Sequence, residues 1–472
     1  MLRIIFATVV LALTLDASAG TGRVIILNSD KPGEGLNDPT PATPVGGNNG
    51  TTRGEQRMNV FLAAAERWQR ELDTNVDIRV SVTFAPIAGC NASGGVLGQA
   101  GPSTVVRDFS GAPRSNTWYP IALANKLAGS DLAPNQNDIF AQFNAAVDTD
   151  TCLGSTRWYY GLDANSGTDI DLFVVVLHEL AHGLGMSGAT GSPGFRENRP
   201  AIFNTHMLDL TLGLRWDQMT QAQRDVSVTN SGNLVWQGET VRANTDRFLL
   251  PITTLTVTSP APVAGSYDIG SAAFGPPAAT ASLAGTIVQM RDAANSDGPK
   301  ETDGCTTLTN AAQLNGKIAI VDRGDCTFVV KARNAQAAGA TGLIVVDNSN
   351  ASCTPPAMGG EASDVTIPVI SVSQRDGMAI QTQLSSNVVV SALLHVDPSQ
   401  LAGTSQQGYV RLYAPCTLEP GSSTYHWDAV ASPSLLMEPS INSDLSHGVD
   451  LSLHQLVDIG WTTPQGRRML RR

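Results

Sequence analysis

One predicted helix sets the strongest limit on how this chain can fold. Residues 169–188 read DIDLFVVVLHELAHGLGMSG, and the six residues before the first histidine of this run are all apolar. Asp169 or Asp171 is a plausible N-terminal cap, and Gly183 and Gly185 are typical of a helix end. A helix that is apolar on every side is buried, so the polar side chains that it carries must find partners inside the protein.

Those polar side chains are His178, Glu179 and His182. Residues four apart lie on one helix face, so both imidazoles can reach a single ion. Neutral imidazole is a good ligand of Zn²⁺, and Glu179 is placed to accept a proton from a water that the ion activates. The alternative is a chance match, because HExxH also occurs on exposed helices. The buried setting favours a zinc site in which Glu179 is the catalytic base.

A catalytic zinc site usually has a third protein ligand. One short family pattern would place it at position 188, but this chain has Gly188 there, although Gly185 of the same pattern is present. Glu197 would complete a His-His-Glu site, yet it lies in a Gly/Pro-rich loop without the expected helix. The other candidates are the remaining histidines, His206, His395, His426, His447 and His454.

The N-terminus resembles a targeting segment. A short basic start, MLR, precedes an apolar run at 4–15, and Ala17-Ser18-Ala19 matches a small-x-small cleavage site. We therefore expect a signal peptide at residues 1–19 and a secreted or periplasmic protein. The apolar run is too short to span a bilayer, and no later run is longer, so we expect no membrane span.

Cysteine usage agrees with export. Six cysteines allow three disulfides in an oxidising compartment, with fifteen possible pairings. Proximity in sequence favours Cys305–Cys326, which leaves Cys90, Cys152, Cys353 and Cys416. For these the pairs Cys90–Cys152 and Cys353–Cys416 are one of the possibilities.

The charge pattern argues against nucleic acid as a partner. Thirty Lys and Arg against 42 Asp and Glu give a net charge of −12, and the chain has no Lys/Arg run. Hydrophobic residues make up 42% of the chain, which is enough for complete cores and excludes a disordered protein.

Hydrophobic periodicity divides the chain into two kinds of segment. Before residue 250 we predict helices over 55–72, 117–129 and 204–210, and strands over 24–28, 76–84, 103–109 and 138–144. From about 250 the sequence becomes rich in β-branched and small residues with frequent turn signals. Within it we predict strands over 316–321, 340–348 and 367–373 and a helix over 327–339, which form a βαβ unit with a further strand.

Motifs near the C-terminus complete a resemblance to a known family. His426 precedes Trp427, Met437 follows eleven residues later, and residues 449–461 read as a helix ending in Asp-x-Gly-Trp. With the HExxHxxG helix, these motifs resemble the leishmanolysin branch of the metzincin zinc peptidases, in which an insertion separates the glycine from the third histidine. The resemblance covers 421–461 well and 55–250 weakly. It implies that His426 is the third zinc ligand and that Met437 lies beneath the metal.

The chain departs from that family in three respects. Glu438 stands between Met437 and Pro439, and no cysteine precedes the first helix, so a Cys-switch propeptide is missing. No oxyanion-stabilising residue stands out, although Tyr425 is adjacent to His426.

The block 255–397 resembles a protease-associated (PA) domain. Its motifs are GKIAIVDRG at 316–324, CTF at 326–328, AQAAGA at 335–340 and IPVISVSQRDG at 367–377. The resemblance implies a non-catalytic lid or substrate-recruiting module. Such an insertion between His182 and His426 is tolerated where its ends lie close together.

Together these observations predict an α+β fold, a two-lobed metzincin-like catalytic domain interrupted by a β-rich PA domain. The expected divisions are a signal peptide at 1–19, an N-terminal lobe at 20–254, the PA domain at 255–397 and a C-terminal lobe at 398–472. The resemblance implies a secreted zinc metalloendopeptidase that acts on proteins or peptides, with Glu179 as general base and His178, His182 and His426 as metal ligands. The alternative is an inactive, zinc-stapled binding or adhesion protein that uses its PA domain for recognition. The oligomeric state is open.

Overall fold

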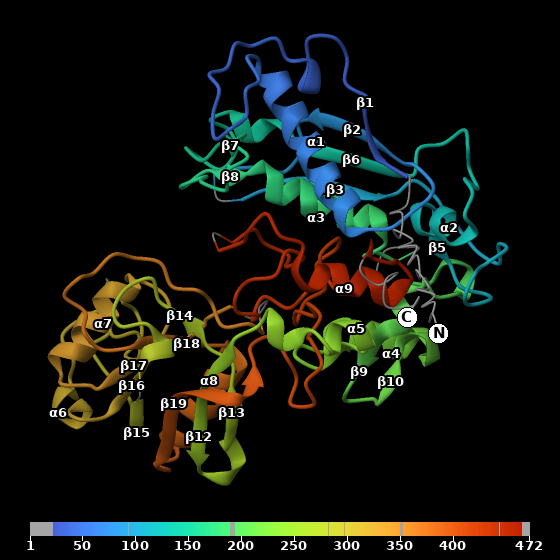
Figure 1. Ribbon diagram of the computed structural model, residues 1–472. Helices are drawn as coiled ribbons and strands as arrows, with labels where there is room; N and C mark the ends of the chain where they lie inside the picture. Colours follow the sequence, from blue (N-terminus) through green and yellow to red (C-terminus); the bar gives the residue numbers. More distant parts are fainter. Residues whose placement is uncertain are drawn as a thin grey trace, which may run out of the picture.

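The computed structural model describes residues 22–464 except 93, 189–193, 282, 297, 350–352 and 443. The expected signal peptide lies outside these residues. Figure 1 shows a mixed α/β chain in which the segment drawn from yellow-green to orange gathers at the lower left, beside the rest of the molecule.

The α-helices of the described part are α1 Arg53–Glu71, α2 Ile121–Ala128, α3 Leu172–Leu184, α4 Gln221–Ser227, α5 Glu239–Arg242, α6 Ala311–Leu314, α7 Phe328–Ala337, α8 Gln374–Ser385 and α9 Asp450–Ile459. The strands before residue 250 are β1 Val24–Asn28, β2 Ile78–Ala85, β3 Gly98–Pro102, β4 Val105–Val106, β5 Tyr119–Pro120, β6 Ile139–Asn144, β7 Trp158–Tyr159, β8 Ile170–Asp171, β9 Met207–Asp209, β10 Leu214–Arg215 and β11 Leu234–Trp236. The later strands are β12 Pro251–Ser259, β13 Gly265–Tyr267, β14 Gly270–Ser271, β15 Leu283–Gln289, β16 Ile318–Asp322, β17 Gly342–Val346, β18 Val369–Val372 and β19 Val390–Leu401.

The N-terminal part is built on a four-stranded sheet with the order β1-β2-β6-β3. The first three strands are parallel, and β3 is an antiparallel edge strand. Every second residue of β2 is buried, so one face of the sheet carries the core. Helices α1 and α3 contribute to that core: the rings of Phe61 and Phe143 lie 4.8 Å apart, and Trp68 Nε1 donates to the Leu177 carbonyl at 3.1 Å.

Most of the elements predicted before residue 200 are confirmed, but one strand is misplaced. Helix α1 begins with a capping box in which the Thr52 side chain and the Glu55 side chain bond each other's backbone N–H. The prediction of a strand over 103–109 is wrong, because only Val105–Val106 forms a strand there. The edge strand β3 is instead formed by Gly98–Pro102. The sequence GQAGP is a weak strand former. Proline has no N–H to donate to a neighbouring strand, and an edge strand tolerates it because one of its sides has no neighbour.

The helix predicted over 204–210 is also wrong. Residues 203–206 form a single 3₁₀ turn, and Met207–Asp209 is strand β9, which pairs with β10 and β11. The buried carboxylate of Asp209 accepts backbone N–H bonds from Thr211 and Leu212 at 2.9 and 3.0 Å. This turn chemistry and the strand pairing override the local helical pattern.

The segment from β12 to β19 forms a separate eight-stranded sheet with the order β13-β12-β19-β15-β16-β17-β18-β14. Strands β15 to β18 are parallel, and α7 connects β16 to β17 as predicted. All five residues of β17 are buried, which fits a central strand with a core on each face. Two hydrophobic clusters fill these cores, and both are drawn from residues of this segment alone.

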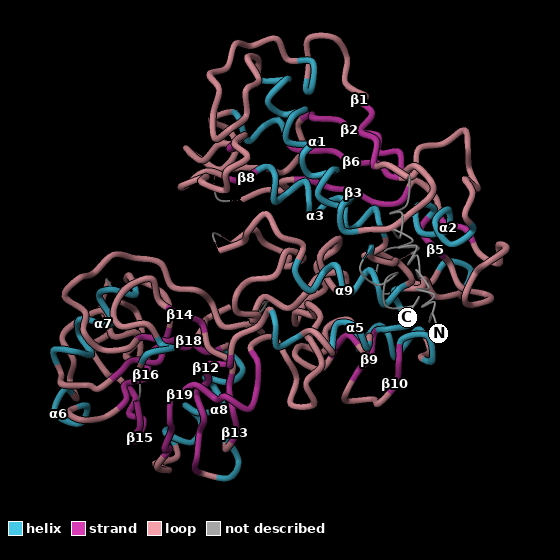
Figure 2. The backbone as a smooth tube through the Cα atoms, viewed as in Figure 1, coloured by secondary structure: helices cyan, strands magenta, loops and turns pink. Residues whose placement is uncertain are grey.

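The remaining hydrophobic core is formed by residues that precede the β12–β19 segment in sequence together with residues that follow it. Trp68, Val176, Trp427 and Met437 all belong to one buried cluster. The segment interrupts this unit at neighbouring points, because Ala402 N–H donates to the Leu250 carbonyl at 2.9 Å. Figure 2 shows that the chain after β19 is mostly loop until α9.

Three disulfides pair all six cysteines, as Cys90–Cys152, Cys305–Cys326 and Cys353–Cys416. The favoured Cys305–Cys326 pair is confirmed, and the other four cysteines adopt the pairing considered for them. Among the described residues, no helix has the length and apolar character needed to cross a membrane.

Candidate metal centre

Helix α3 carries the sequence-predicted site and is fixed at both ends. At its start the Asp171 carboxylate accepts the Phe173 N–H at 2.9 Å and a bond from His447 Nε2 at 2.8 Å. At its end Gly185 has φ +137°, and an added Cβ there would lie 2.7 Å from the Ile459 side chain. Asp171 therefore caps the helix, whereas Gly183 lies inside it.

The structure brings His178, His182 and His426 together. His426 Nε2 lies 3.2 Å from His178 Nε2 and 3.2 Å from His182 Nε2. The three offered ligand atoms all lie within 4.8 Å of one another, and no other such group of three occurs among the described residues. Two of these residues come from α3 and the third from a loop 244 residues further along the chain.

Each of these rings uses its other nitrogen to bind a backbone carbonyl. The Nδ1 contacts are His178 to Leu436 O at 2.8 Å, His182 to Met186 O at 2.8 Å and His426 to Ser422 O at 2.7 Å. A carbonyl oxygen only accepts, so each Nδ1 carries the proton and each Nε2 presents a lone pair. Fixing the tautomer in this way is the usual outer support of a metal-binding histidine.

The positions of the nitrogens suit a cation with tetrahedral coordination. Three lone pairs within 4.8 Å of one another repel unless a positive charge lies between them. Zn–N bonds of about 2.0–2.1 Å at tetrahedral angles would separate the nitrogens by about 3.3 Å, close to the two 3.2 Å separations. Burial also lowers the pKa of His178 to about 3, which keeps the imidazole neutral.

Glu179 lies beside this cluster on the same helix. It is 6% exposed, and burial raises its pKa to about 8, while a hydrogen bond from the Ala100 N–H acts in the opposite direction. A Cβ at Gly98 would lie 2.9 Å from Glu179 Cγ, so edge strand β3 reaches the catalytic candidate only because that residue is glycine. Burial therefore makes this carboxylate a stronger base than an exposed glutamate, which suits it to general-base work.

Sequence reasoning missed the contribution of β3 and of the four backbone groups that hold the site. These are the Ala100 N–H and the carbonyls of Met186, Ser422 and Leu436. Backbone groups leave no residue-type signal. The only trace in the sequence is the pair of glycines in GQAGP, which is consistent with a close backbone approach.

The other candidate ligands lie elsewhere. Glu197 is exposed, and its nearest cation is Arg107 at 3.9 Å. His206 stacks on Trp236, and His454 packs against Phe248. His395 Nε2 lies 3.2 Å from Thr256 Oγ1 in the eight-stranded sheet.

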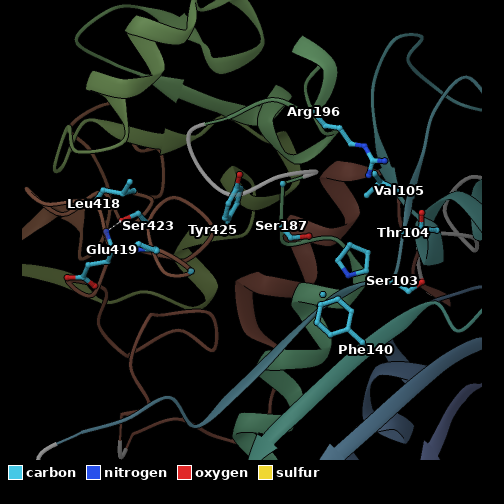
Figure 3. Close-up of a pocket in the computed structure, with 15 residues that line it drawn as sticks. Ser103, Thr104, Val105, Phe140, Ser187, Arg196, Leu418, Glu419, Ser423 and Tyr425 are labelled. Atoms are coloured by element: carbon cyan, nitrogen blue, oxygen red, sulfur yellow. Dashed lines mark hydrogen bonds between the residues drawn. The ribbon is translucent and has the colours of Figure 1, made fainter. Parts of the chain in front are cut away.

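A cleft of about 380 Å³ is lined partly by residues that neighbour the cluster in sequence, although the three histidines and Glu179 are not among its lining residues. Its lining includes Ser187 from the segment after α3, Phe140 from β6 and Tyr425 next to His426 (Figure 3). Burial raises the pKa of Tyr425 to about 12, so its hydroxyl stays protonated. Figure 3 places Arg196 and Glu419 on opposite sides of this space. The cleft therefore offers both apolar and polar surface.

Glu438, which departs from the family pattern, closes the turn formed by residues 435–438, which contains Met437. Its carboxylate accepts the Leu435 N–H and the Asn442 amide, both at 2.8 Å. Leu436, the residue after Leu435 in the same turn, supplies the carbonyl that orients His178. Burial raises the pKa of Glu438 from 4.5 to about 8, so the folded protein favours its protonated form near neutral pH.

Glu438→Gln is expected to flatten the pH dependence of stability. Below pH 4.5 the carboxyl is protonated in both the folded and the unfolded state, and between 4.5 and about 8 only the folded state keeps the proton. Stability therefore falls as pH rises through this window, on the order of a few kcal/mol for such a shift. Urea denaturation with a chelator present should find the variant more stable than wild type at pH 8 but not at pH 4.5. Equal pH profiles would contradict the assigned shift.

Comparisons with known proteins identify one part of the chain directly. The family described as "PA domain" matches residues 281–380, which hold strands β15 to β18 of the eight-stranded sheet, so the chain contains a PA domain. A second family, described as "SPBPB7E8-like", matches residues 48–265, which include α1 and α3.

The individual relatives cover little of the molecule. Vacuolar-sorting receptor 2 of Arabidopsis thaliana is 33% identical over 178 residues, 36% of this chain and 27% of that protein. Aminopeptidase YwaD of Bacillus subtilis (strain 168) is 33% identical over 134 residues, 26% of this chain and 29% of that protein. The solved structure of BSAP, a zinc aminopeptidase from Bacillus subtilis, has 25% identity and a TM-score of 0.22 over 33% of this chain and 35% of that one.

This chain spans 11–29% of the length of the curated relatives that it matches. Their printed names include a receptor and an aminopeptidase, which have no activity in common. The shared sequence therefore does not by itself give this chain an activity, whereas the histidine cluster has chemistry of its own.

Proposed function

We propose that this protein is a zinc-dependent endopeptidase whose metal ligands are His178, His182 and His426. The observation that carries the proposal is the convergence of three proton-free Nε2 atoms, two of them on the helix that also bears Glu179. Zinc bound there would act as a Lewis acid toward a substrate carbonyl and toward water.

The chain's own groups would perform the remaining work. Glu179 would take a proton from the attacking water and return it to the departing amine. The three backbone carbonyls would hold the imidazoles in the required tautomer. Met437, which is fully buried and whose carbonyl accepts the Trp427 N–H at 2.7 Å, would support the cluster as the turn methionine of a leishmanolysin-like metzincin.

The PA domain would serve as a substrate-recruiting module within a two-lobed catalytic unit. We place the protein outside the reducing cytoplasm, because disulfides form and persist in oxidising compartments and this chain has three. The signal peptide proposed at residues 1–19 would direct it there. Proteins or peptides are the proposed substrates.

A second candidate function is partner binding without catalysis. The PA domain and the similarity to a receptor favour it, since neither requires a reaction. Glu179 argues for the enzyme, because a purely structural zinc site has no use for a buried carboxyl beside it.

Purified protein is expected to degrade casein. A zinc chelator should abolish this activity, and added zinc should restore it. Internal cleavage of an N-terminally acetylated peptide separates an endopeptidase from an aminopeptidase, which needs a free amine. Zinc binding without hydrolysis of either substrate would favour the binding protein.

A further inference from the structure

His426 lies on a hairpin that the PA domain touches at two points. We call residues 410–428 the third-ligand hairpin. Its two arms, residues 410–413 and 424–428, are joined by backbone bonds from Thr424 N–H to the Tyr413 carbonyl at 2.7 Å and from Tyr413 N–H to the His426 carbonyl at 2.9 Å. A third bond runs from Asp428 N–H to the Arg411 carbonyl at 3.1 Å. Movement of one arm is therefore passed to the arm that bears the histidine.

The first contact is covalent. Cys416, in the turn of the third-ligand hairpin, forms a disulfide with Cys353, which lies between β17 and β18 of the PA sheet. Cys353 is buried in the PA domain, whereas Cys416 and most of the residues up to Gly421 are exposed. The turn therefore packs little against the rest of the protein, and the disulfide is the covalent bond that fixes it to the PA domain.

The second contact is an ion pair. Arg411 Nη1, on the arm opposite His426, pairs with the carboxylate of Asp268, between β13 and β14 of the eight-stranded sheet. The Arg411 side chain is only 12% exposed, and its Nε donates to the Thr404 carbonyl at 3.0 Å. Shielding from water strengthens such a pair relative to a surface one.

The turn of this hairpin also sets the chemistry of His426. Its Ser422 carbonyl accepts the His426 Nδ1 proton at 2.7 Å, and the same turn lines the cleft through Leu418, Glu419 and Ser423. The position of this carbonyl fixes the direction in which Nε2 points, so a shift of the turn changes the geometry offered to a metal.

We propose that the PA domain positions the third metal ligand, by holding the third-ligand hairpin through the Cys353–Cys416 disulfide and the Asp268–Arg411 pair. Cys353 and Asp268 are thus positioning residues of the metal centre, although they belong to the inserted domain. This inference rests on the proposed zinc site and deepens it: the inserted domain is part of the metal centre's support as well as a recruiting module.

The test compares two disulfides that both involve the PA domain. The zinc dissociation constant is measured by competition with a chromogenic chelator, well below the melting temperature. Cys353→Ser with Cys416→Ser is expected to weaken zinc binding about 10–100-fold, the usual effect of losing outer support. Cys305→Ser with Cys326→Ser removes a disulfide internal to the PA domain and should leave zinc affinity unchanged.

A second pair of variants covers the case in which a disulfide variant fails to fold. Asp268→Asn should weaken zinc binding, whereas Asp364→Asn, which breaks the Arg333–Asp364 pair inside the PA domain, should not. Wild-type zinc affinity in every folded variant would overturn the positioning role, even if melting temperatures fall. An equal loss in the two control variants would show general destabilisation instead, and would also overturn it. Wild-type protein that binds no zinc would overturn the proposed function itself.

Discussion

Glu179→Gln should bind zinc and fold like wild type yet lose nearly all turnover. The amide has almost the same size as the carboxylate, so the space between α3 and β3 stays filled, and its Oε1 can still accept the Ala100 N–H. It cannot take a proton from water, and general acid–base groups contribute roughly 10²–10⁴-fold to rate. The measurement is kcat on a peptide substrate, together with zinc content and melting temperature.

Glu197→Gln is the matched control, because it makes the same change at an exposed glutamate on the same segment of chain. Its activity should equal that of wild type, since its nearest cation is Arg107 and it does not belong to the histidine cluster. Retention of more than about a hundredth of wild-type kcat by Glu179→Gln would contradict the general-base role, given the range above.

Much of the fold could be predicted because its elements carry strong periodic signals. Helix α1 shows an amphipathic pattern and a capping box, and β16, α7 and β17 alternate in the manner of a βαβ unit. The signals fail where structure depends on distant pairing. Strand β3 is extended because it borders β6, and β9 because it lies between β10 and β11, although neither sequence favours a strand on its own.

The candidate site divides in the same way. His178 and His182 are predictable from spacing because a helix places i and i+4 on one face. His426 could be predicted only through a family resemblance, since no local rule relates residues 244 apart. The Cys353–Cys416 pairing was among the possibilities that the cysteine count allowed. The carbonyls that orient all three rings and the Asp268–Arg411 pair required the structure, because they depend on how separate segments pack.

His426→Ala should abolish most zinc binding. It removes one of three converging nitrogens and leaves His178 and His182, which are too few for a catalytic site. We expect the zinc dissociation constant to rise by more than the 10–100-fold expected for outer supports. Zinc stabilises wild type by RT ln(1 + [L]/Kd), about 4 kcal/mol at a thousand times Kd, and the variant should lose this gain.

The measurement is the melting temperature with and without added zinc, which separates ligand loss from a packing defect. His426 is 5% exposed, so alanine leaves a cavity that lowers stability under both conditions, whereas only ligand loss removes the difference between them. His454→Ala is the control, because His454 packs against Phe248 away from the cluster, and it should retain the full zinc-dependent shift. A His426→Ala protein that keeps this shift would remove the third ligand from the site, and with it the main support for a leishmanolysin-like metzincin, because the other two histidines belong to a motif that many zinc peptidases share.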